Sequence, residues 1–404
     1  MRDQQGSTRF LSIAVASVLI IIGCIFYVVF RKQATLNNIS GKTAVESVSE
    51  NVKKQTGDSW EARIEAALKS FDCPDFSKPQ WDSSQYQGPL IDTHFHISTI
   101  PDANPDGPED WKEEKFYTSP GVNMAMSDYI CTLKNDGTSG KVFAFFPVYP
   151  NIEWQSLKLV KRTMERYPDT FVPFINAPDG DLGSVDGPTL KRMLGAYPGL
   201  FKGFGEQGLY AAAAPELPPD SKRMLGTYPV VRENNLVIYF HLGVGQEDSW
   251  EKILKANRDI TFIWHGDNLA INPQVGRSSL KIIEGILSRN PNVYYGVDEL
   301  YGDIVLINTE SNAKKAVSYI KENKESLLKK DLATWKGFIE DHPDQVIWGT
   351  DRGSYLYSLD IELGRAMSDY TRAFIAGLDP SVREKFAYKN AERLISKNLK
   401  NKNF

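Results

Sequence analysis

The sequence predicts an α/β fold, a closed (β/α)8 TIM barrel preceded by a transmembrane helix. Eight short apolar runs alternate with amphipathic stretches from Pro89 onward, which is the pattern of parallel strands joined by helices. No Gly-x-Gly-x-x-Gly motif follows the first run, which disfavours an open dinucleotide-binding sheet. Near the N-terminus, residues 10–30 carry no charge, and a helix of this length can cross a bilayer.

The composition suits a large folded domain and argues against a polyanion as partner. Of the 404 residues, 41% are hydrophobic and 11% are aromatic, which is enough for a full core. The 47 basic and 51 acidic side chains give a net charge of −4, so no basic surplus attracts nucleic acid. The 3 cysteines do not make a disulfide framework, and whether Cys73 and Cys131 pair is left open.

Three segments precede the barrel. Residues 1–9 are a short tail, residues 10–30 are predicted to be an uncleaved transmembrane anchor, and residues 31–58 are a polar tether. The apolar run continues past Cys24, whereas a cleaved signal peptide has a shorter apolar core followed by small residues. Residues 21–24, Ile-Ile-Gly-Cys, resemble the lipobox of bacterial lipoproteins, so acylation at Cys24 is the alternative. The short tail favours a single-pass membrane protein whose barrel lies outside the cytoplasm.

A lead-in segment, residues 59–88, connects the tether to the barrel at residues 89–398. It is expected to contain one helix, with four large apolar side chains on one face: Trp60, Ile64, Leu68 and Phe71. The expected strands are Leu90–His96, Lys141–Val148, Phe171–Ile175, Leu200–Glu206, Leu236–Leu242, Ile260–His265, Val293–Val297 and Val346–Thr350. Helical stretches between them include Trp154–Arg166, Trp250–Asn257 and Leu280–Arg289.

An eight-residue near-repeat marks three successive crossings from helix to strand. Its copies are KRTMERYP (161–168), KRMLGAYP (191–198) and KRMLGTYP (222–229). Each copy is expected to end a helix shortly before a strand, with proline just beyond the last turn.

Polar side chains that can bind a metal stand at the ends of separate apolar runs. His94 and His96 form a His-x-His pair, whose two imidazoles point the same way from a strand. The others are Glu206 after GLFKGFG, His241 in LVIYFHLG, His265 in ITFIWHG and Asp351 after VIWGT. Each alone has an ordinary explanation, such as Asp351 capping the next helix. Together they are expected to meet at the carboxyl-end rim of the barrel and to bind one or two divalent ions, zinc or another such as manganese.

These motifs resemble the amidohydrolase superfamily of metal-dependent barrel hydrolases. The resemblance rests on IDTHFHI (91–97), the two later strand-end histidines and WGTD (348–351). GFGEQGL (203–209) is similar to the GE-x-GL signature of TatD-type hydrolases, and YKNAERLI (388–395) resembles the end of amidohydrolase-related domains. The resemblance covers residues 89–398 and points to a superfamily, not to a substrate.

The resemblance implies a role for each of the six residues. Two would bind the more buried metal, His94 and His96, and two would bind the second, His241 and His265. Glu206 would contact both metals, and Asp351 would touch the first metal and act as the proton shuttle.

Two further residues, Lys202 and Asp92, are expected on the strands that carry the proposed metal ligands. Many superfamily members bridge their metals with a carboxylated lysine on the fourth strand. Lys202 is expected on the same strand face as Glu206, but about 13 Å deeper and too far from the rim, in the lower core with a polar partner. Asp92 is expected one layer below His94, where it would orient the ligands.

The predicted function is hydrolysis of an ester, lactone, amide or phosphoester in a small-molecule substrate by a metal-bound hydroxide. One alternative is a mononuclear metal-dependent decarboxylase of the same superfamily, similar to aminocarboxymuconate-semialdehyde decarboxylase, which does not need Glu206. A second alternative is a membrane-tethered, non-catalytic binding protein, which predicts missing ligands.

The loops on the rim are expected to set specificity. Residues 98–122 form a long, acidic, proline-rich loop, and residues 301–345 are expected to add extra helices. Asp298, Glu299 and Arg352 follow strand ends and either meet the substrate or pair with one another.

Overall fold

The computed structural model describes residues 60–68, 80–97, 126–138, 141–148, 153–176, 186–209, 217–243, 245–266, 279–298, 300, 312–353 and 360–400. The chain divides into two compact units, residues 1–61 and 62–404, and nearly all described residues belong to the second. The predicted anchor, tether and lipobox-like segment lie outside the described residues. Within the described ranges, no helix is long and apolar enough to cross a membrane.

Eight parallel strands form one sheet in sequence order, and its two edges meet. The strands are β1 (Phe95–His96), β2 (Val142–Pro147), β3 (Phe171–Asn176), β4 (Gly203–Gly208), β5 (Val237–His241), β6 (Phe262–Gly266), β7 (Val293–Val297) and β8 (Val346–Trp348). Phe95 pairs in parallel with Arg352, and the Asp351 N–H donates to the His94 carbonyl at 3.0 Å. The sheet is therefore closed, as the sequence predicts.

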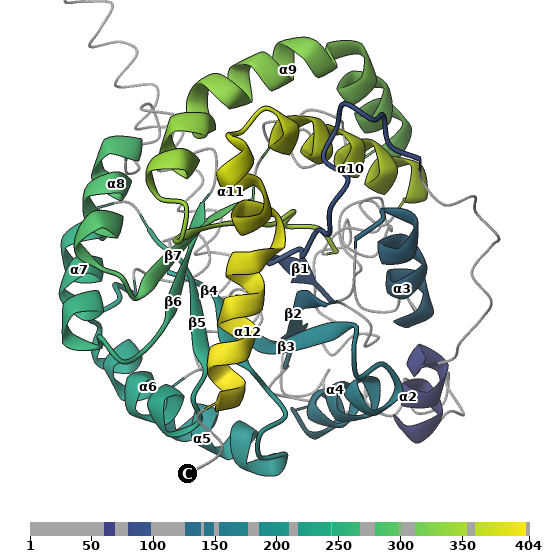
Figure 1. Ribbon diagram of the computed structural model, residues 1–404. Coiled ribbons are helices and arrows are strands. Elements are labelled where there is room, and N and C mark those ends of the chain that lie inside the picture. Colours follow the sequence, from purple (N-terminus) through teal and green to yellow (C-terminus); the bar gives the residue numbers. More distant parts are fainter. Residues whose placement is uncertain are drawn as a thin grey trace, which may run out of the picture. The chain divides into compact units, whose positions relative to one another are not determined.

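Helices surround the strands (Figure 1). They are α2 (Trp60–Leu68), α3 (Met126–Asn135), α4 (Glu153–Arg166), α5 (Gly187–Ala196), α6 (Lys222–Glu233), α7 (Glu247–Ala256), α8 (Leu280–Arg289), α9 (Ala313–Asp341), α10 (Ile361–Ala376), α11 (Pro380–Glu384), a π-helical turn (Lys385–Lys389) and α12 (Asn390–Lys400). Several begin at a side-chain cap. The Asp360 carboxylate, for example, accepts the Leu363 N–H at 3.0 Å at the start of α10.

The strand side chains alternate between two apolar layers. Inside the barrel, one cluster contains Phe145, Tyr239 and Ile263, while a larger cluster between strands and helices contains Phe240 and Trp264. Because the strand period is two residues, Tyr239 and Ile263 place the next inward positions at His241 and His265. Alternation thus aims both histidines into the barrel mouth.

The C-terminal helix α12 covers the end of the barrel where the strands begin. In Figure 1, α12 crosses the ring of strands, and Leu394 belongs to the same inner cluster as Ile91. The Asn390 side-chain amide donates to the carbonyls of Val346 at 2.7 Å and Pro343 at 2.9 Å. This packing fills the barrel floor and leaves the opposite rim for the site.

The regular part of β1 is shorter than the predicted Leu90–His96. The His94 N–H donates to the Asp92 carboxylate at 3.0 Å, so it does not take part in a strand ladder. By contrast, the observed β7 and α8 have the predicted bounds.

One prediction about a helix is wrong. The third repeat copy does not end a helix: it begins α6 at Lys222, and Pro229 lies inside that helix. The Ser221 hydroxyl accepts the Met224 N–H at 3.3 Å, and this cap starts the helix there. After β7, extra helices were expected in residues 301–345; the described residues 312–345 contain the 29-residue helix α9, and residues 301–311 lie outside the described residues.

Candidate metal centre

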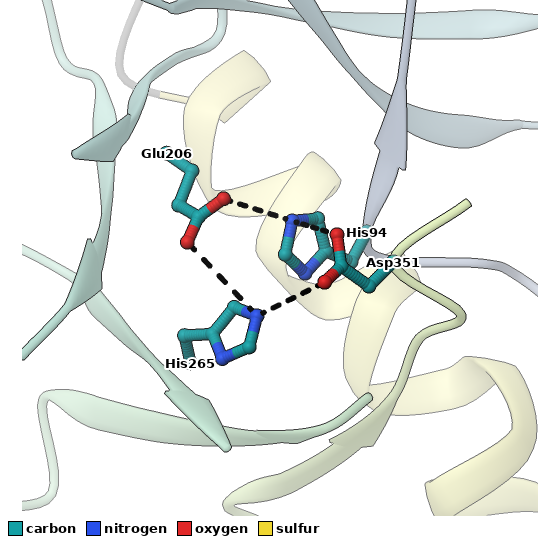
Figure 2. A group of neighbouring side chains, drawn as sticks. All are labelled: His94, Glu206, His265 and Asp351. Atoms are coloured by element: carbon teal, nitrogen blue, oxygen red, sulfur yellow. Dashed lines mark ion pairs between the residues drawn. The ribbon is translucent and has the colours of Figure 1, made fainter. Parts of the chain in front are cut away.

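The six side chains singled out by the sequence lie together at the carboxyl ends of β1, β4, β5, β6 and β8. Figure 2 shows four of them pointing toward one another: His94, Glu206, His265 and Asp351. One ligand atom from each of these four lies within 4.8 Å of all the others, so the group can hold a metal ion. His94 and His265 are buried, and the two carboxylates are partly exposed.

The first set of ligand atoms surrounds the histidines of β1. His94 Nε2 lies 3.1 Å from His96 Nε2, 3.3 Å from Glu206 Oε2 and 3.4 Å from Asp351 Oδ1. His96 Nε2 lies 3.0 Å from Asp351 Oδ1 and 3.6 Å from Glu206 Oε2. Ligands at zinc bond lengths in a tetrahedron are about 3.3–3.4 Å apart, so these separations fit one shared ion.

The second set uses the other oxygen of each carboxylate. Glu206 Oε1 lies 2.8 Å from His241 Nδ1 and 3.9 Å from His265 Nε2. Asp351 Oδ2 lies 3.6 Å from His265 Nε2. The imidazoles of His241 and His265 stack at 4.2 Å with an interplanar angle of 8°. Each carboxylate therefore faces the β1 histidines with one oxygen. With the other oxygen Glu206 faces the histidines of β5 and β6, and Asp351 faces that of β6.

An irregularity in β4 turns Glu206 toward this cluster. A Cβ atom on Gly203 would lie 2.1 Å from the Phe174 ring, which marks Gly203 as facing the barrel interior. The pairing of β4 with β5 then shifts between Phe204 and Gln207. Strict alternation from Gly203 would point Glu206 outward, and the shift points it inward instead.

Gly205, inside this irregularity, admits no larger residue. Its φ is +128°, and a Cβ would lie 2.3 Å from the Tyr239 carbonyl oxygen.

The prediction for Lys202 is wrong. It does not lie in the lower core on the face of Glu206, because the β4 irregularity separates their faces. It precedes the inward Gly203 and so lies on the outer side, partly exposed, where its Nζ donates to the Gly199 carbonyl at 2.8 Å. It has the expected polar partner but no place in the site.

Asp92 holds the backbone of the site, as its predicted orienting role requires. Its carboxylate accepts the backbone N–H of His94 and of Thr350, both at 3.0 Å, and the Thr350 hydroxyl at 2.5 Å. Burial raises the pKa of Asp92 to about 6. It thereby ties β1 to the chain leading to Asp351, which adopts φ +52°.

The carboxylates and imidazoles of the cluster shift one another's pKa values. Burial disfavours the ionised form of Glu206, but His265, His241 and His94 outweigh it and hold the pKa of Glu206 well below its usual range. Burial also disfavours the ionised form of Asp351, but His94, His265 and His96 outweigh burial and lower the pKa of Asp351. Burial alone would lower the pKa of His94, but Asp351 and Asp298 raise it well above its usual value. The carboxylates thus stay ionised and attract a cation.

The residues present fit a divalent metal. Both ring nitrogens of His265 are buried and have no hydrogen-bond partner among the residues that the structure describes, although Nε2 faces Glu206 and Asp351. A buried imidazole left this way is costly unless a ligand meets it. Nitrogen and carboxylate donors of this kind suit zinc and similar ions.

The sequence did not predict the contacts of Asp298, nor any role of Tyr239 in the site. The Tyr239 hydroxyl donates to Asp298 Oδ2 at 2.7 Å and lies 3.3 Å from His94 Nδ1. Burial and Asp298 raise the pKa of Tyr239 well above its usual value. The sequence held one sign that Tyr239 belongs to the site: it lies two residues before His241, on the same inward face of β5.

Asn176 was also missed. It ends β3, pairs with Pro147 and lies two residues beyond Phe174, which faces the interior. Alternation therefore points Asn176 inward, one layer above His96, whose register partner on β2 is Phe145. Its side-chain oxygen Oδ1 is buried with no hydrogen-bond partner among the described residues.

The sequence left open whether Asp298, Glu299 and Arg352 meet the substrate or pair with one another. Arg352 forms a buried ion pair with Asp136 near the C-terminal end of α3. Asp298 faces His94, and Glu299 lies outside the described residues.

Comparison with protein-family models and with curated proteins finds no match. Among solved structures, an amidohydrolase from Burkholderia multivorans with bound zinc is 12% identical over 76% of this chain and 99% of that chain, with a TM-score of 0.48. An uncharacterised TIM-barrel protein from Bordetella bronchiseptica is 15% identical over 76% and 99%, with a TM-score of 0.46. A probable 2-pyrone-4,6-dicarboxylic acid hydrolase from Acinetobacter baumannii, with citric acid bound, is 11% identical over 76% and 99%, with a TM-score of 0.44.

The similar structures thus include amidohydrolase-superfamily proteins, the family that the sequence motifs resemble. Likeness of this size concerns the fold and carries over neither a substrate nor a reaction.

Proposed function

We propose that this chain is a membrane-anchored, metal-dependent hydrolase that holds two divalent ions and cleaves an ester, lactone, amide or phosphoester of a small molecule. One observation carries the proposal: Glu206 and Asp351 each direct one oxygen to the His94 and His96 pair and the other oxygen to the His241 and His265 side. Carboxylates placed between two imidazole pairs suit two ions better than one.

The residues of the chain divide the chemistry between them. His94 and His96 would hold the first ion, and His241 and His265 the second. Bound ions would supply Lewis acidity, which lowers the pKa of water and polarises a substrate carbonyl or phosphoryl oxygen. Asp351 takes the proton from the attacking water and passes it to the leaving group.

The substrate enters from the rim above the metal layer. Asn176 supports this proposal, because its inward amide oxygen has no partner among the described residues and can accept a hydrogen bond from a substrate in that layer. An aromatic side chain beside the β1 histidines favours a dry site: the Phe145 ring lies 4.9 Å from the His94 ring and 5.5 Å from the His96 ring. Exclusion of water strengthens the electrostatic interactions of the site.

The two alternative functions, a decarboxylase and a non-catalytic binding protein, predict different sets of metal ligands. A mononuclear decarboxylase needs one ion and no strand-four carboxylate, whereas here Glu206 is a member of the ligand cluster. A non-catalytic binding protein predicts lost ligands, but the described residues contain all six. Both features favour the hydrolase.

The test is the metal content of the full chain, purified in detergent. We expect about two ions of zinc or manganese in the wild type and about one in Glu206→Gln, with loss of activity in a screen of esters, lactones, amides and phosphoesters. Glu251→Gln on α7 is the control, because the exposed fractions of Glu251 and Glu206 are similar, 18% and 14%. A wild type with one ion, and a Glu206→Gln variant with unchanged content and rate, would favour the decarboxylase.

A further inference from the structure

A buried carboxylate lies behind His94, on the side away from the ligand cluster. Asp298 follows β7 and is 1% exposed. Its Oδ2 atom lies 3.4 Å from His94 Nδ1, while His94 Nε2 faces Glu206 and Asp351. The two ring nitrogens of His94 are therefore divided between the ligand cluster and Asp298.

Tyr239 fixes the carboxylate in this place. Its hydroxyl donates to Asp298 Oδ2 at 2.7 Å, and its ring packs 4.8 Å from the His94 ring. Tyr239 is fully buried in the barrel interior. The hydroxyl and the imidazole thus converge on the same carboxylate oxygen.

Gly349 provides the space that Asp298 occupies. A Cβ atom on Gly349 would lie 2.1 Å from Asp298 Oδ1 and 2.9 Å from the Cβ of His94. The glycine in the WGTD stretch is therefore needed for the close approach of β8 to this pair.

The buried carboxylate of Asp298 lowers the stability of the fold when no ion is bound. Within the part of the chain that the structure describes, Asp298 Oδ1 is buried without a hydrogen-bond partner. A buried carboxylate with an unsatisfied oxygen destabilises a protein unless another charge compensates it. Among the described residues His265 has no such neighbour, since its buried Nδ1 finds no hydrogen-bond partner there. The extra carboxylate thus belongs to His94 specifically, which points to a task at the ion that His94 would bind.

We propose that Asp298 and Tyr239 form a positioning pair that holds the His94 imidazole in its metal-binding orientation and tightens the first ion. The inference rests on the metal site of the proposed function. His94 Nδ1 lies 3.3 Å from the Tyr239 hydroxyl oxygen and 3.4 Å from Asp298 Oδ2, so its N–H is directed at this pair. Nε2 would then present its lone pair to the ion, and the negative charge would make that nitrogen a stronger donor. Tyr239 keeps the carboxylate from turning away.

A second tyrosine and aspartate pair gives a matched control. The Tyr370 hydroxyl donates to Asp331 Oδ2 at 2.6 Å between α10 and α9, and Asp331 is 5% exposed. This pair has the same chemistry and similar burial, but it has no site histidine. Its substitution should lower folding stability without changing metal binding.

The experiment measures zinc affinity of the full chain in detergent by competition with a chromophoric chelator, together with melting of the metal-free protein. Asp298→Asn should weaken the tighter zinc site by about 10- to 100-fold, and Tyr239→Phe should weaken it less, in the same direction. Asp331→Asn and Tyr370→Phe should leave zinc affinity within about twofold of wild type while lowering the melting temperature.

The outcomes separate this inference from the proposed function. If the wild type binds zinc and Asp298→Asn and Tyr239→Phe bind it equally well, the positioning pair is wrong and the hydrolase proposal stands. If the control variants lose as much affinity as the site variants, general destabilisation explains the loss and the pair is again wrong. A wild type that binds no zinc or manganese removes the metal site itself. Should Asp298→Asn not fold, Tyr239→Phe decides alone, since it keeps the ring and the carboxylate.

Discussion

Asp351 and Glu206 belong to one cluster, but their surroundings differ. The Asp351 side chain is 22% exposed and Glu206 14%, so Asp351 is the carboxylate more open to the rim. Asp351 follows β8 with φ +52°, a conformation that aspartate tolerates better than most residues, and its N–H donates to the His94 carbonyl at 3.0 Å. The backbone therefore holds Asp351 beside the β1 histidines while its side chain stays within reach of a substrate.

We predict that the Asp351→Asn substitution removes most of the catalytic activity but leaves most of the metal bound. Most metal should remain, because four imidazoles and Glu206 are left, while kcat should fall by about 10²- to 10⁴-fold since the amide cannot take a proton. The measurements are metal content and steady-state kinetics on the first substrate that the screen identifies. A variant with full metal and an unchanged kcat would exclude Asp351 as the proton shuttle.

The helices hold one another by ion pairs as well as by apolar packing. Between α7 and α8, Arg289 Nε lies 2.6 Å from Glu251 Oε1 and Arg289 Nη2 lies 3.0 Å from Oε2, a two-point contact. Hydrogen bonds from Arg289 outweigh the opposing effect of burial and lower the pKa of Glu251 to about 2. A two-point pair is geometrically favourable, although the arginine side chain is 54% exposed and water screens it.

We therefore predict that Glu251→Gln lowers the free energy of unfolding by about 1 kcal/mol at pH 7. The pKa is lower in the folded state, so the contribution exists above the unfolded pKa near 4.5 and disappears as pH falls toward 2. Denaturant unfolding at several pH values should show the two proteins converging below pH 4.5. Glu233→Gln, which breaks a pair with Lys191 whose side chains are both more than half exposed, should change little at any pH. A constant difference down to pH 3 would contradict the assignment.

At the scale of the whole molecule, the closed barrel brings residues from five strands to one rim. The predicted membrane anchor lies outside the described residues, but one observation bears on the compartment. Cys131, on α3, is disulfide-bonded, and its partner lies outside the described residues. Disulfides persist mainly in oxidising compartments, which supports the proposal that the barrel lies outside the cytoplasm.

We predict that residues 10–30 stay attached and anchor the chain. Expressed in bacteria, the protein should remain in the membrane after alkaline carbonate washing, dissolve in detergent and keep an N-terminus before residue 10 by mass spectrometry. Protease added to spheroplasts should digest the barrel. A mature chain that begins at an acylated Cys24 would establish the lipoprotein alternative, and a barrel protected in intact spheroplasts would reverse the orientation.

Local patterns in the sequence determined the eight strands and the six residues at their ends. A period of two residues and an apolar run are properties of neighbouring positions, and in a parallel barrel the carboxyl ends of the strands must meet at one rim. His241 and His265 therefore lie where alternation from Tyr239 and Ile263 points them.

Only the tertiary structure decided the contacts that depend on distant parts of the chain. Glu206 turns inward because β4 and β5 shift register, which alternation within β4 does not predict. Asp298 and Tyr239 meet at His94 from separate strands, and the space for Asp298 depends on Gly349 of another. The physical reason is that hydrogen bonds and close approaches between strands are set by their register and packing, which no single stretch of sequence contains.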